Sequence, residues 1–537
     1  MSIPHLAPQG PKTILKVHDK PFVALAGEVH NSDSSSLSYM EGIWDIAERL
    51  HMNTLLLPVS WEIVEPEEDV FDFALVKGLI DQARQRDEKI IFLWFGSWKN
   101  AECMYAPGWV KKDRVRFPRG QIVKGKDKTA RKYTPEMDVA IPYATLSYLG
   151  TETMKADAKA FANLMAFIKE YDEEENTVIM VQVENETGLL GNSREVSDLA
   201  DEYFERDVPE DFLSYLKAHT ETMVPDVKEA VEKAPEKGNW KEVFGDIADE
   251  IFSAYYVSGY VESVAKAGKE VYPLPMSANC WLEGGKQPGY YPSGGPVSRV
   301  HEVWKYRAPS IDLLTPDIYL PAFHEICEEY TRRGTPLMIP ECAVHSYCAP
   351  RLVYTIGHHH TIGYSPFGFD DIGKPFNTIQ GVLFGMDVSD PALKTPQDFD
   401  EYAKTEELLG MLKDKIGEKL GSSDLQAACG EVADYMPLCF KDVVITAIFK
   451  SPIETRTNGY LLAVHEKEGE VYVMGNICML QVGSIDPDHP NLDLLKVEEG
   501  VFDKEGNWVP GRRFNGDETA MMSFKTPSIW KIEYFTY

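Results

Sequence analysis

The tetrapeptide Glu184-Asn185-Glu186-Thr187 follows a short apolar run, Thr-Val-Ile-Met-Val-Gln-Val at residues 177–183. A short β-branched run of this kind is typical of a buried strand in a parallel sheet. A second run, at residues 336–340, ends directly before Glu341. Polar residues at the carboxyl ends of parallel strands lie where α/β folds carry out chemistry. Two carboxylates on two such strand ends are the minimum equipment for cleaving a glycosidic bond.

The pair Glu186 and Glu341 therefore predicts a retaining glycosidase site. One carboxylic acid protonates the leaving oxygen while a carboxylate about 5–5.5 Å away attacks the anomeric carbon. The member of the pair that acts as the acid needs a raised pKa, which burial and the charge of the other carboxylate could supply. Asn185 is predicted to donate to a sugar hydroxyl, and Tyr319 to hydrogen-bond Glu341. A single strand-end Glu is more often a salt-bridge partner or helix cap, so the prediction rests on the two together.

Aromatic residues cluster near the predicted strand ends, where their rings would stack on the flat faces of sugars. Core packing is the alternative for each of them, most of all for Trp94, which lies inside its strand. The set is Trp61, Trp94, Trp98, Trp109, Trp281 and Tyr319.

No metal site or cofactor is expected. His358, His359 and His360 are adjacent, and three adjacent positions cannot all face one site on a regular helix or strand. Cys342 follows Glu341 and would point to the opposite side of the strand, as a buried inert thiol. The eight cysteines show neither CxxC pairs nor zinc spacing, which favours free thiols in a reducing cytoplasm. The Gly-rich loop at 284–296 lacks a Walker sequence and is either a substrate-edge loop or a surface turn.

Strand-like and helix-like segments alternate along the first 420 residues. Eight such repeats indicate a (β/α)8 TIM barrel of the α/β class rather than a doubly wound open sheet, which would need a Gly-rich loop after the first strand. The predicted strands are residues 22–27, 54–59, 89–95, 177–183, 274–279, 311–319, 336–340 and 361–365, and helices are predicted at 38–51, 73–87, 152–172 and 397–419. A long polar loop is predicted at about 105–150.

The repeat is interrupted once and then ends. Residues 190–270 are mostly helical and charged, which predicts a helical insertion on the catalytic face followed by the barrel helix. From about residue 440 the apolar runs become short and alternating, which predicts a small antiparallel, sandwich-like β-domain. The expected division is a catalytic barrel at 1–425 and a β-domain at 426–537.

The chain has 537 residues and a net charge of −31, with 44% hydrophobic and 26% charged residues. So acidic a surface should repel nucleic acid and anionic membranes, and it suits a neutral substrate. Residues 1–20 have no continuous apolar stretch typical of a signal peptide, and no run is long enough to span a membrane. The expectation is a cytoplasmic enzyme, for which a monomer and a homo-oligomer both remain open.

Five segments, spread over residues 15–375, resemble a clan A glycoside hydrolase, most closely the family 35 β-galactosidases, with some likeness to family 42. They are Gly27-Glu28-Val29-His30, the stretch 53–73, Gly96-Ser97-Trp98-Lys99-Asn100-Ala101-Glu102, Val181-Gln182-Val183-Glu184-Asn185-Glu186 and Ile339-Pro340-Glu341. The stretch 289–319 is similar to a bacterial subgroup with a small C-terminal β-domain. Ser97, Trp98, Cys103, Val64 and Thr187 depart from the family pattern around the sugar pocket.

The resemblance implies Glu186 as acid/base and Glu341 as nucleophile, with Asn185, Ala101 and Glu102 on the non-reducing sugar. Asn100, Trp98, Trp281, Tyr319 and Glu28 complete the predicted substrate-binding set. The resulting hypothesis is an exo-acting retaining β-galactosidase that needs no metal or organic cofactor and acts on an oligosaccharide or glycoside. A β-glucosidase, a β-glucosaminidase and a non-catalytic carbohydrate-binding barrel remain the alternatives.

Overall fold

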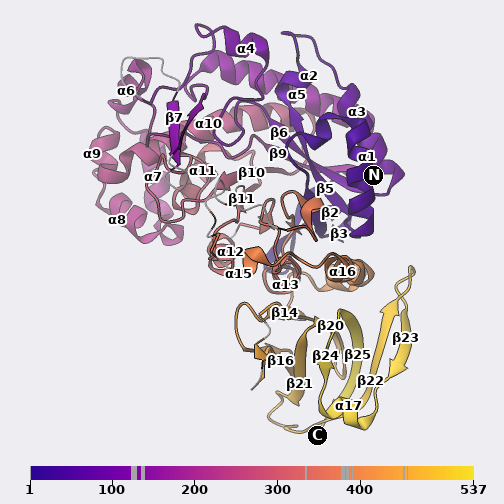
Figure 1. Cartoon of the computed structure of the whole chain (residues 1–537). Helices are drawn as coiled ribbons and strands as arrows, with labels where there is room; N and C mark the ends of the chain where they lie inside the picture. Colours follow the sequence, from indigo (N-terminus) through magenta and orange to yellow (C-terminus); the bar gives the residue numbers. More distant parts are fainter. Residues whose placement is uncertain are drawn as a thin grey trace.

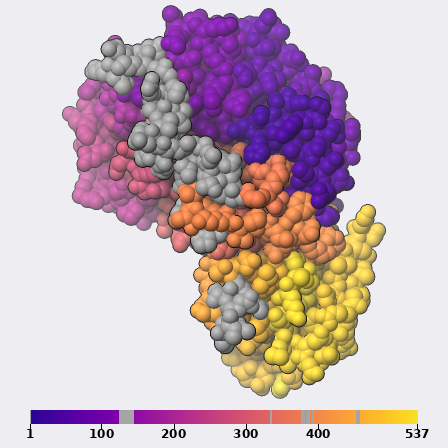
Figure 2. Space-filling model, viewed as in Figure 1, coloured from indigo at the N-terminus to yellow at the C-terminus, as the bar shows by residue number. Residues whose placement is uncertain are grey.

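The computed structural model describes residues 2–122, 130–134, 139–332, 335–375, 381, 386, 388–389, 391–451, 454–455 and 457–537. Its first part is a barrel and its last part a β-domain, which forms a separate lobe below the barrel in Figures 1 and 2. The predicted polar loop at 105–150 lies partly outside the described residues. Within it the structure has helix α4 (Gly108–Lys112) and a hairpin of β7 (Ala130–Thr134) and β8 (Val139–Tyr143).

Eight parallel strands form the barrel sheet in the order β11-β10-β9-β6-β5-β4-β13-β12. A hydrogen bond of 2.9 Å from the Ile318 N–H to the Glu341 carbonyl, next to β11 and β12, closes the ring. The strands are β4 (Ala24–Glu28), β5 (Thr54–Ser60), β6 (Lys89–Phe95), β9 (Val178–Val183), β10 (Met276–Trp281), β11 (Leu313–Asp317), β12 (Met338–Ile339) and β13 (Gly363–Tyr364). The predicted TIM barrel is confirmed, and each predicted strand overlaps an observed one.

One strand shows why these sequences build a barrel. In β6, Ile91 and Leu93 pack in the barrel interior, whereas Phe92 and Trp94 belong to the core shared with the surrounding helices. Successive side chains point to opposite faces of a strand, so a strand that is buried on both faces must be apolar throughout. The helices that follow the eight strands are α1 (Leu37–Arg49), α3 (Ala74–Gln85), α5 (Thr151–Asp172), α10 (Ala248–Val271), α11 (His301–Arg307), α12 (Phe323–Arg332), α13 (Cys348–Tyr354) and α16 (Phe399–Lys419).

A three-stranded antiparallel sheet precedes the barrel and was not predicted. It consists of β1 (His5–Gln9), β2 (Lys12–Val17) and β3 (Lys20–Phe22). Leu15 and Val17 of β2 are buried against Ala24 and Leu56 of the barrel interior. The sheet therefore closes the amino-terminal end of the barrel, opposite the strand ends that carry Glu186 and Glu341.

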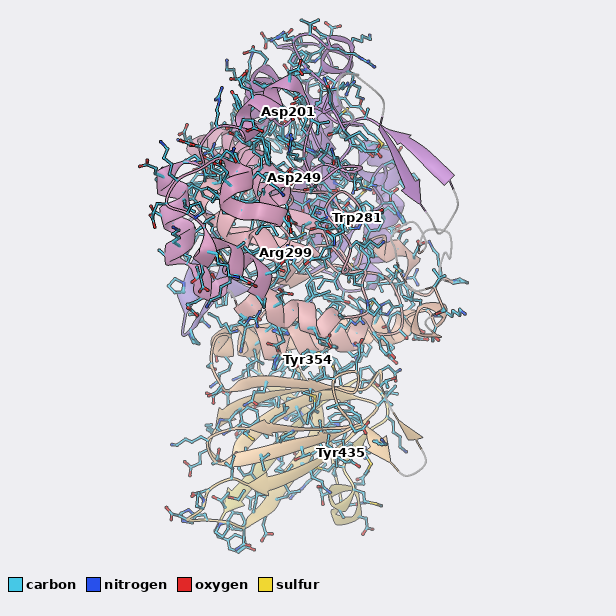
Figure 3. All side chains as sticks on the ribbon, turned by 90° about the vertical axis from the view of Figure 1, so that its left-hand side faces the viewer. Asp201, Asp249, Trp281, Arg299, Tyr354 and Tyr435 are labelled. Carbon is cyan, nitrogen blue, oxygen red and sulfur yellow. The ribbon has the colours of Figure 1, made fainter. Side chains whose placement is uncertain are left out.

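A helical insertion follows β9 and precedes the barrel helix α10. It consists of α6 (Asp198–Phe204), α7 (Glu210–Ala218), α8 (Pro225–Lys233) and α9 (Trp240–Phe244), which lie at one side of the barrel in Figure 1. Phe212, Trp240 and Phe252 form part of an aromatic cluster that joins these helices to α10. Arg299, Asp201 and Asp249 mark this side of the molecule in Figure 3.

The C-terminal part is a sandwich of two antiparallel sheets. The larger sheet has the order β14-β19-β20-β25-β22-β23 and the smaller the order β15-β16-β21-β24. Val443, Ile445 and Ala447 alternate along β16 (Val443–Ile448) and pack with Leu461 and Val473 of the larger sheet. The remaining strands are β14 (Leu425–Cys429), β15 (Tyr435–Cys439), β19 (Tyr460–Lys467), β20 (Glu470–Asn476), β21 (Cys478–Ser484), β22 (Leu492–Phe502), β23 (Trp508–Arg513), β24 (Ser523–Phe524) and β25 (Ser528–Thr536).

The barrel and the β-domain share apolar core. Leu408 and Leu412 of α16 belong to one buried cluster with Leu462 and Met474 on the outer face of the larger sheet. Tyr354, which lies at this junction in Figure 3, is part of the same cluster. A buried side-chain pair, Arg351 and Glu431, also crosses the junction. The division at 425/426 stays a prediction, since α16 packs on both parts.

Candidate active site

Glu186 and Glu341 meet at the carboxyl ends of the barrel strands. One carboxylate oxygen each of Glu186, Asp317 and Glu341 lies within 4.8 Å of the other two. The exposed fractions of Glu186 and Glu341 are 7% and 4%, so both acids are largely removed from water. The two acids that the sequence separates by 155 positions therefore form a single buried carboxylate pair, with Asp317 as a third member.

An unusual backbone turn places Glu186. Glu184 and Glu186 adopt φ values of 63° and 46°, which are rare for residues with a side chain. The Glu186 N–H donates to the Asn279 side-chain oxygen at 3.0 Å, and its carbonyl accepts from the Ala101 N–H at 3.1 Å. Left-handed residues held by such contacts store local strain and are common at active sites.

Three donors hold the Glu341 carboxylate. The Tyr319 hydroxyl donates to Oε2 at 2.8 Å, and the Asn185 amide donates to Oε1 at 3.2 Å. The Asn279 amide lies 3.4 Å from the same Oε1. The predicted bond from Tyr319 to Glu341 is present. These three bonds fix the orientation of the Glu341 carboxylate, which a nucleophile needs for attack.

Lys99 is a functional residue that sequence reasoning missed. It is only 3% exposed, and its Nζ donates to the Asn185 side-chain oxygen at 3.0 Å. Burial by itself lowers the pKa of a lysine, but the carboxylates of Glu341, Glu186, Glu28 and Asp317 outweigh it and raise the pKa of Lys99. Lys99 is therefore a permanent cation inside the carboxylate cluster. The sequence feature that could have identified it is a lysine directly after Trp98, in the loop that follows β6.

Asp317, at the end of β11, was also missed. Its Oδ2 accepts from the Asn279 amide at 2.8 Å, and its residue is 2% exposed. Burial, followed by repulsion from Glu341, raises the pKa of Asp317 well above its usual value. The sequence feature that could have identified Asp317 is its position two residues before Tyr319, inside the predicted strand at 311–319.

Glu28, at the end of β4, belongs to the same electrostatic group. It is fully buried, and neither of its carboxylate oxygens has a hydrogen-bond partner. Burial, and then the Glu341 charge, raises the pKa of Glu28 well above its usual value. The sequence predicted Glu28 as substrate-binding. The structure places it in the buried layer next to the nucleophile candidate, outside the set of residues that line the cavity.

A cavity of about 240 Å³ opens over the carboxylate pair. Four residues of the predicted substrate-binding set line it: Asn100, Glu102, Trp281 and Tyr319. Trp281, at the end of β10, is labelled in Figure 3. The other lining residues are Asn31, Lys99, Met104, Glu186, Leu282, Asp317, Leu320, Glu341 and Phe367.

Two predicted contact residues turn inward instead. The Trp98 indole is 1% exposed, donates to the Gly188 carbonyl at 3.1 Å and packs edge-on against Tyr260. Ala101 is fully buried and packs with Leu190, and its N–H is used by Glu186. Neither side chain lines the cavity, and both residues help to position the loop after β6, so the cavity lining does not support their predicted sugar contacts. Trp61 and Trp94 are likewise core residues.

Asn185 was predicted to donate to a sugar hydroxyl. Its amide donates to Glu341 and its oxygen accepts from Lys99, so in the structure it links the nucleophile candidate to the buried cation.

A second acidic pair, Glu184 and Asp157, supports the loop after β6 from below. Glu184 accepts from the Trp98 N–H at 2.8 Å, and Asp157 accepts from the Ser97 N–H at 3.1 Å and the Trp94 indole at 2.9 Å. Burial, and then the neighbouring Asp157, raises the pKa of Glu184 well above its usual value. The pair fixes the backbone that carries Lys99, Asn100 and Ala101.

Two of the three adjacent histidines come together in the structure. A π-helical turn at Thr355–His359 brings His358 and His359 together with Glu328 of α12, their ligand atoms within 4.8 Å of one another. His358 already pairs with Glu328 at 2.9 Å, and burial lowers the pKa of His359 to about 3. The cluster lies apart from the cavity. Cys342 is a buried free thiol, and burial raises its pKa. The other seven cysteines are also free thiols.

The chain is similar to known proteins in two respects: its fold, and the sequence of one C-terminal segment. No curated protein matches the chain. The model of a domain of unknown function, DUF5597, matches residues 401–525, which comprise most of α16 and most of the β-domain. In the part of the chain that the structure describes, no helix is long and apolar enough to cross a membrane.

Among solved structures, the chain is similar to a β-galactosidase from Bacillus circulans sp. alkalophilus, with 12% identity, a TM-score of 0.44, and coverage of 73% of this chain and 57% of that one. It is also similar to the catalytic domain of β-amylase from Paenibacillus polymyxa, with 11% identity, a TM-score of 0.44, and coverage of 68% of this chain and 98% of that one. A third similar structure is the exo-β-1,4-mannosidase Op5Man5 from Opitutaceae bacterium strain TAV5, with 12% identity, a TM-score of 0.41, and coverage of 76% of this chain and 62% of that one. The chain thus spans less than two-thirds of the galactosidase and of the mannosidase. At such identities the likeness concerns the fold alone.

Proposed function

We propose that the chain is an exo-acting retaining β-glycosidase in which Glu341 is the nucleophile and Glu186 the acid/base. The observation that carries the proposal is the close approach of the two carboxylates, with oxygens within 4.8 Å. Retaining enzymes separate their carboxyl groups by about 5–5.5 Å, whereas inverting enzymes leave about 6.5–9.5 Å for a water molecule.

The proposed reaction has two displacements. In the first, the Glu341 carboxylate attacks the anomeric carbon and the bond to the leaving oxygen breaks, while Glu186 transfers its proton to that oxygen. In the second, Glu186 takes a proton from water, the water oxygen attacks the anomeric carbon, and the ester bond to Glu341 breaks. The bonds from Tyr319 and Asn185 orient the nucleophile for both steps.

Exo action is supported by the size of the cavity. A volume of about 240 Å³ lies below the range of about 300–1,000 Å³ that is typical for drug-sized ligands. A single sugar unit suits such a space. Galactose as that sugar rests on the sequence resemblance, and β-glucoside and β-glucosaminide remain alternatives.

The test is hydrolysis of a panel of aryl β-glycosides with Glu341→Gln and Glu186→Gln as variants and Glu236→Gln as the matched control, because the Glu236 side chain is 98% exposed. We expect turnover of at least one glycoside with net retention by NMR, a loss of about 10⁴-fold or more in Glu341→Gln, and no loss in Glu236→Gln. Near-normal turnover in both active-site variants, or an inverted product, would refute the assignment.

A further inference from the structure

Three side chains that can bind a metal ion meet beside α12, apart from the cavity. They are Glu328 of α12 and the adjacent residues His358 and His359, which the π-helical turn at Thr355–His359 brings together. One ligand atom of each residue, a carboxylate oxygen or a ring nitrogen, lies within 4.8 Å of the other two. Adjacent side chains diverge on a regular helix or strand, but this turn is neither. Turns of this kind occur frequently at functional sites.

An ion pair accounts for only two of the three side chains. His358 Nε2 lies 2.9 Å from a Glu328 oxygen. His359, by contrast, is only 4% exposed, and its Nε2 atom is buried without a hydrogen-bond partner. Buried polar atoms in proteins are almost always paired. An unpaired imidazole nitrogen in a residue that meets a carboxylate and a second imidazole therefore points to a ligand that joins all three.

The donor set fits a zinc ion. Zn²⁺ binds imidazole nitrogens and carboxylate oxygens at about 2.0–2.2 Å, and sites with two His and one Glu keep a fourth position for water. Mg²⁺ and Ca²⁺ prefer oxygen ligands, so the two imidazoles disfavour them.

Only a small movement would bring the three side chains to zinc-binding distances. Two ligand atoms on one tetrahedral zinc ion lie roughly 3.3–3.5 Å apart, which is less than the observed limit of 4.8 Å. The Glu328 and His358 side chains are 59% and 41% exposed, so they are free to close on the ion. The buried His359 fixes the position at which they would meet.

The turn that carries the two histidines also packs on the β-domain. A Cβ on Gly357, within this turn, would lie 2.5 Å from the Ala427 side chain of β14. The third histidine of the triplet, His360, points elsewhere, since its Nδ1 accepts from the Gly421 N–H at 3.2 Å in the segment between α16 and β14. An ion that links Glu328 to this turn would tie α12 of the barrel to a segment that contacts the β-domain.

We propose that Glu328, His358 and His359 bind a zinc ion, which holds the π-helical turn against α12 and stabilises the junction between the barrel and the β-domain. Each histidine supplies one ring nitrogen and Glu328 one carboxylate oxygen, with water as the fourth ligand. The site is separate from the proposed catalytic pair, and its test does not depend on glycosidase activity.

Calorimetric titration of the metal-free wild-type chain with ZnCl₂ tests the site. We expect one Zn²⁺ per chain with a Kd of about 10 µM or tighter. Loss of a ligand in Glu328→Gln, His358→Gln or His359→Gln should weaken binding by roughly 100-fold or more, since even the loss of a hydrogen-bond partner of a ligand costs about 10- to 100-fold. Glu328 and His358 are exposed, so their variants test the site even if His359→Gln fails to fold.

The matched control is His489→Gln. His489 Nδ1 also lies 2.9 Å from a carboxylate, that of Asp486, but this pair belongs to no three-ligand cluster among the residues that the structure describes. Zn²⁺ affinity should stay unchanged in this variant. Glu328→His supplies a different zinc ligand at the same exposed position, so it should bind Zn²⁺ within about tenfold of the wild type. Rescue of this kind distinguishes a metal ligand from a residue with a purely structural role.

Thermal unfolding gives a second readout. Zn²⁺ at about 100 times its Kd should raise the melting temperature of the wild type and of His489→Gln, because a ligand that binds the folded chain stabilises it. The same concentration should leave His358→Gln unchanged. A Kd weaker than about 10 µM for the wild type would overturn the proposal. So would equal Zn²⁺ affinity in the wild type, Glu328→Gln and His358→Gln, which would show an adventitious ion only, or tighter binding of Mg²⁺ or Ca²⁺ than of Zn²⁺.

Discussion

The Tyr319 hydroxyl makes the shortest hydrogen bond that the Glu341 carboxylate receives, at 2.8 Å. A bond to a charged group in a buried site contributes about 1.5–3 kcal/mol, which corresponds to roughly 10- to 100-fold in rate if it acts in the transition state. At the scale of single residues, Tyr319 therefore tests how far the orientation of the nucleophile matters.

We expect Tyr319→Phe to lower kcat/KM for the best substrate by roughly 10- to 100-fold while the melting temperature stays close to that of the wild type. Tyr330→Phe is the matched control, since its buried hydroxyl bonds to Cys280 and the Pro296 carbonyl rather than to a carboxylate. Equal losses in the two variants would show that Tyr319 acts only through packing.

At the scale of elements, the turn from β6 into its loop is the most crowded part of the site. A Cβ on Gly96 would lie 2.5 Å from the Trp94 indole nitrogen, 2.6 Å from an Asp157 oxygen and 2.7 Å from a Glu184 oxygen. All three side chains are buried, and hydrogen bonds join Trp94 to Asp157 and Glu184 to the Trp98 N–H, so they cannot move aside without breaking these bonds. The close approach therefore requires a glycine at this position.

Gly96→Ala should therefore destabilise the chain by about 1–3 kcal/mol and lower activity further by displacing Lys99 and Asn100. Thermal unfolding and kcat/KM measure the two effects. Gly108→Ala in α4 is the control, because a Cβ there would meet no atom within 4 Å. Wild-type activity in Gly96→Ala would contradict the positioning role of this turn.

The short connection between α3 and β6 contains a buried acid, Glu88. Burial raises the pKa of Glu88 to about 8 from an ordinary value of 4.5, and its Oε2 has no partner. In the unfolded chain this acid ionises above pH 4.5, whereas in the folded chain it stays protonated up to about pH 8. Its contribution to stability therefore falls as the pH rises from 4.5 to 8.

Glu88→Gln removes this titration. We expect the variant to be more stable than the wild type by roughly 3 kcal/mol at pH 7 and above, with the difference shrinking toward pH 4. Urea unfolding at several pH values measures it. A gain that is the same at pH 4 and pH 8 would mean that packing, not ionisation, explains the effect.

At the scale of the whole molecule, barrel and β-domain are held together by shared core and by a buried ion pair. Arg351 of α13 donates to Glu431 of the β-domain at 2.9 Å, and His324 lies 3.1 Å from the same carboxylate. Burial opposes ionisation of Glu431, but the hydrogen bond from Arg351 outweighs it and lowers the pKa of Glu431 to about 2. The pair stabilises the junction above about pH 4.5, and this contribution is lost as the pH falls toward 2.

Arg351→Met leaves a buried carboxylate without its main partner, so we expect a loss of about 3–5 kcal/mol at pH 7 and a smaller loss at pH 3. The double variant Arg351→Met/Glu431→Gln should regain part of it. Calorimetry is the appropriate measurement, since a single transition for the wild type indicates one cooperative unit. Two separate transitions in the wild type would instead favour the predicted division into independent domains at 425/426.

The amino-acid sequence by itself determined the barrel and the two candidate catalytic acids. Strands such as β6 are apolar on both faces, and this local pattern identifies them without knowledge of their neighbours. Glu186 and Glu341 follow two of these strands, and parallel strands bring their carboxyl ends to one edge. The unpredicted N-terminal sheet lacks this pattern, because only three of the six residues of β2 are buried and β2 pairs only with β1 and β3, its neighbours in sequence.

Only the tertiary structure decided which side chains surround the acids. Lys99, Asp317 and Glu28 come from three different strand ends, and their charges interact because the closed ring places those ends around one point. Trp98 and Ala101 belong to a motif that predicted sugar contact, but the left-handed backbone at Asn100, Ala101 and Glu186 turns their side chains inward. The direction of a side chain beyond a strand end depends on such turns and on partners far along the chain, which is why spacing alone cannot assign it.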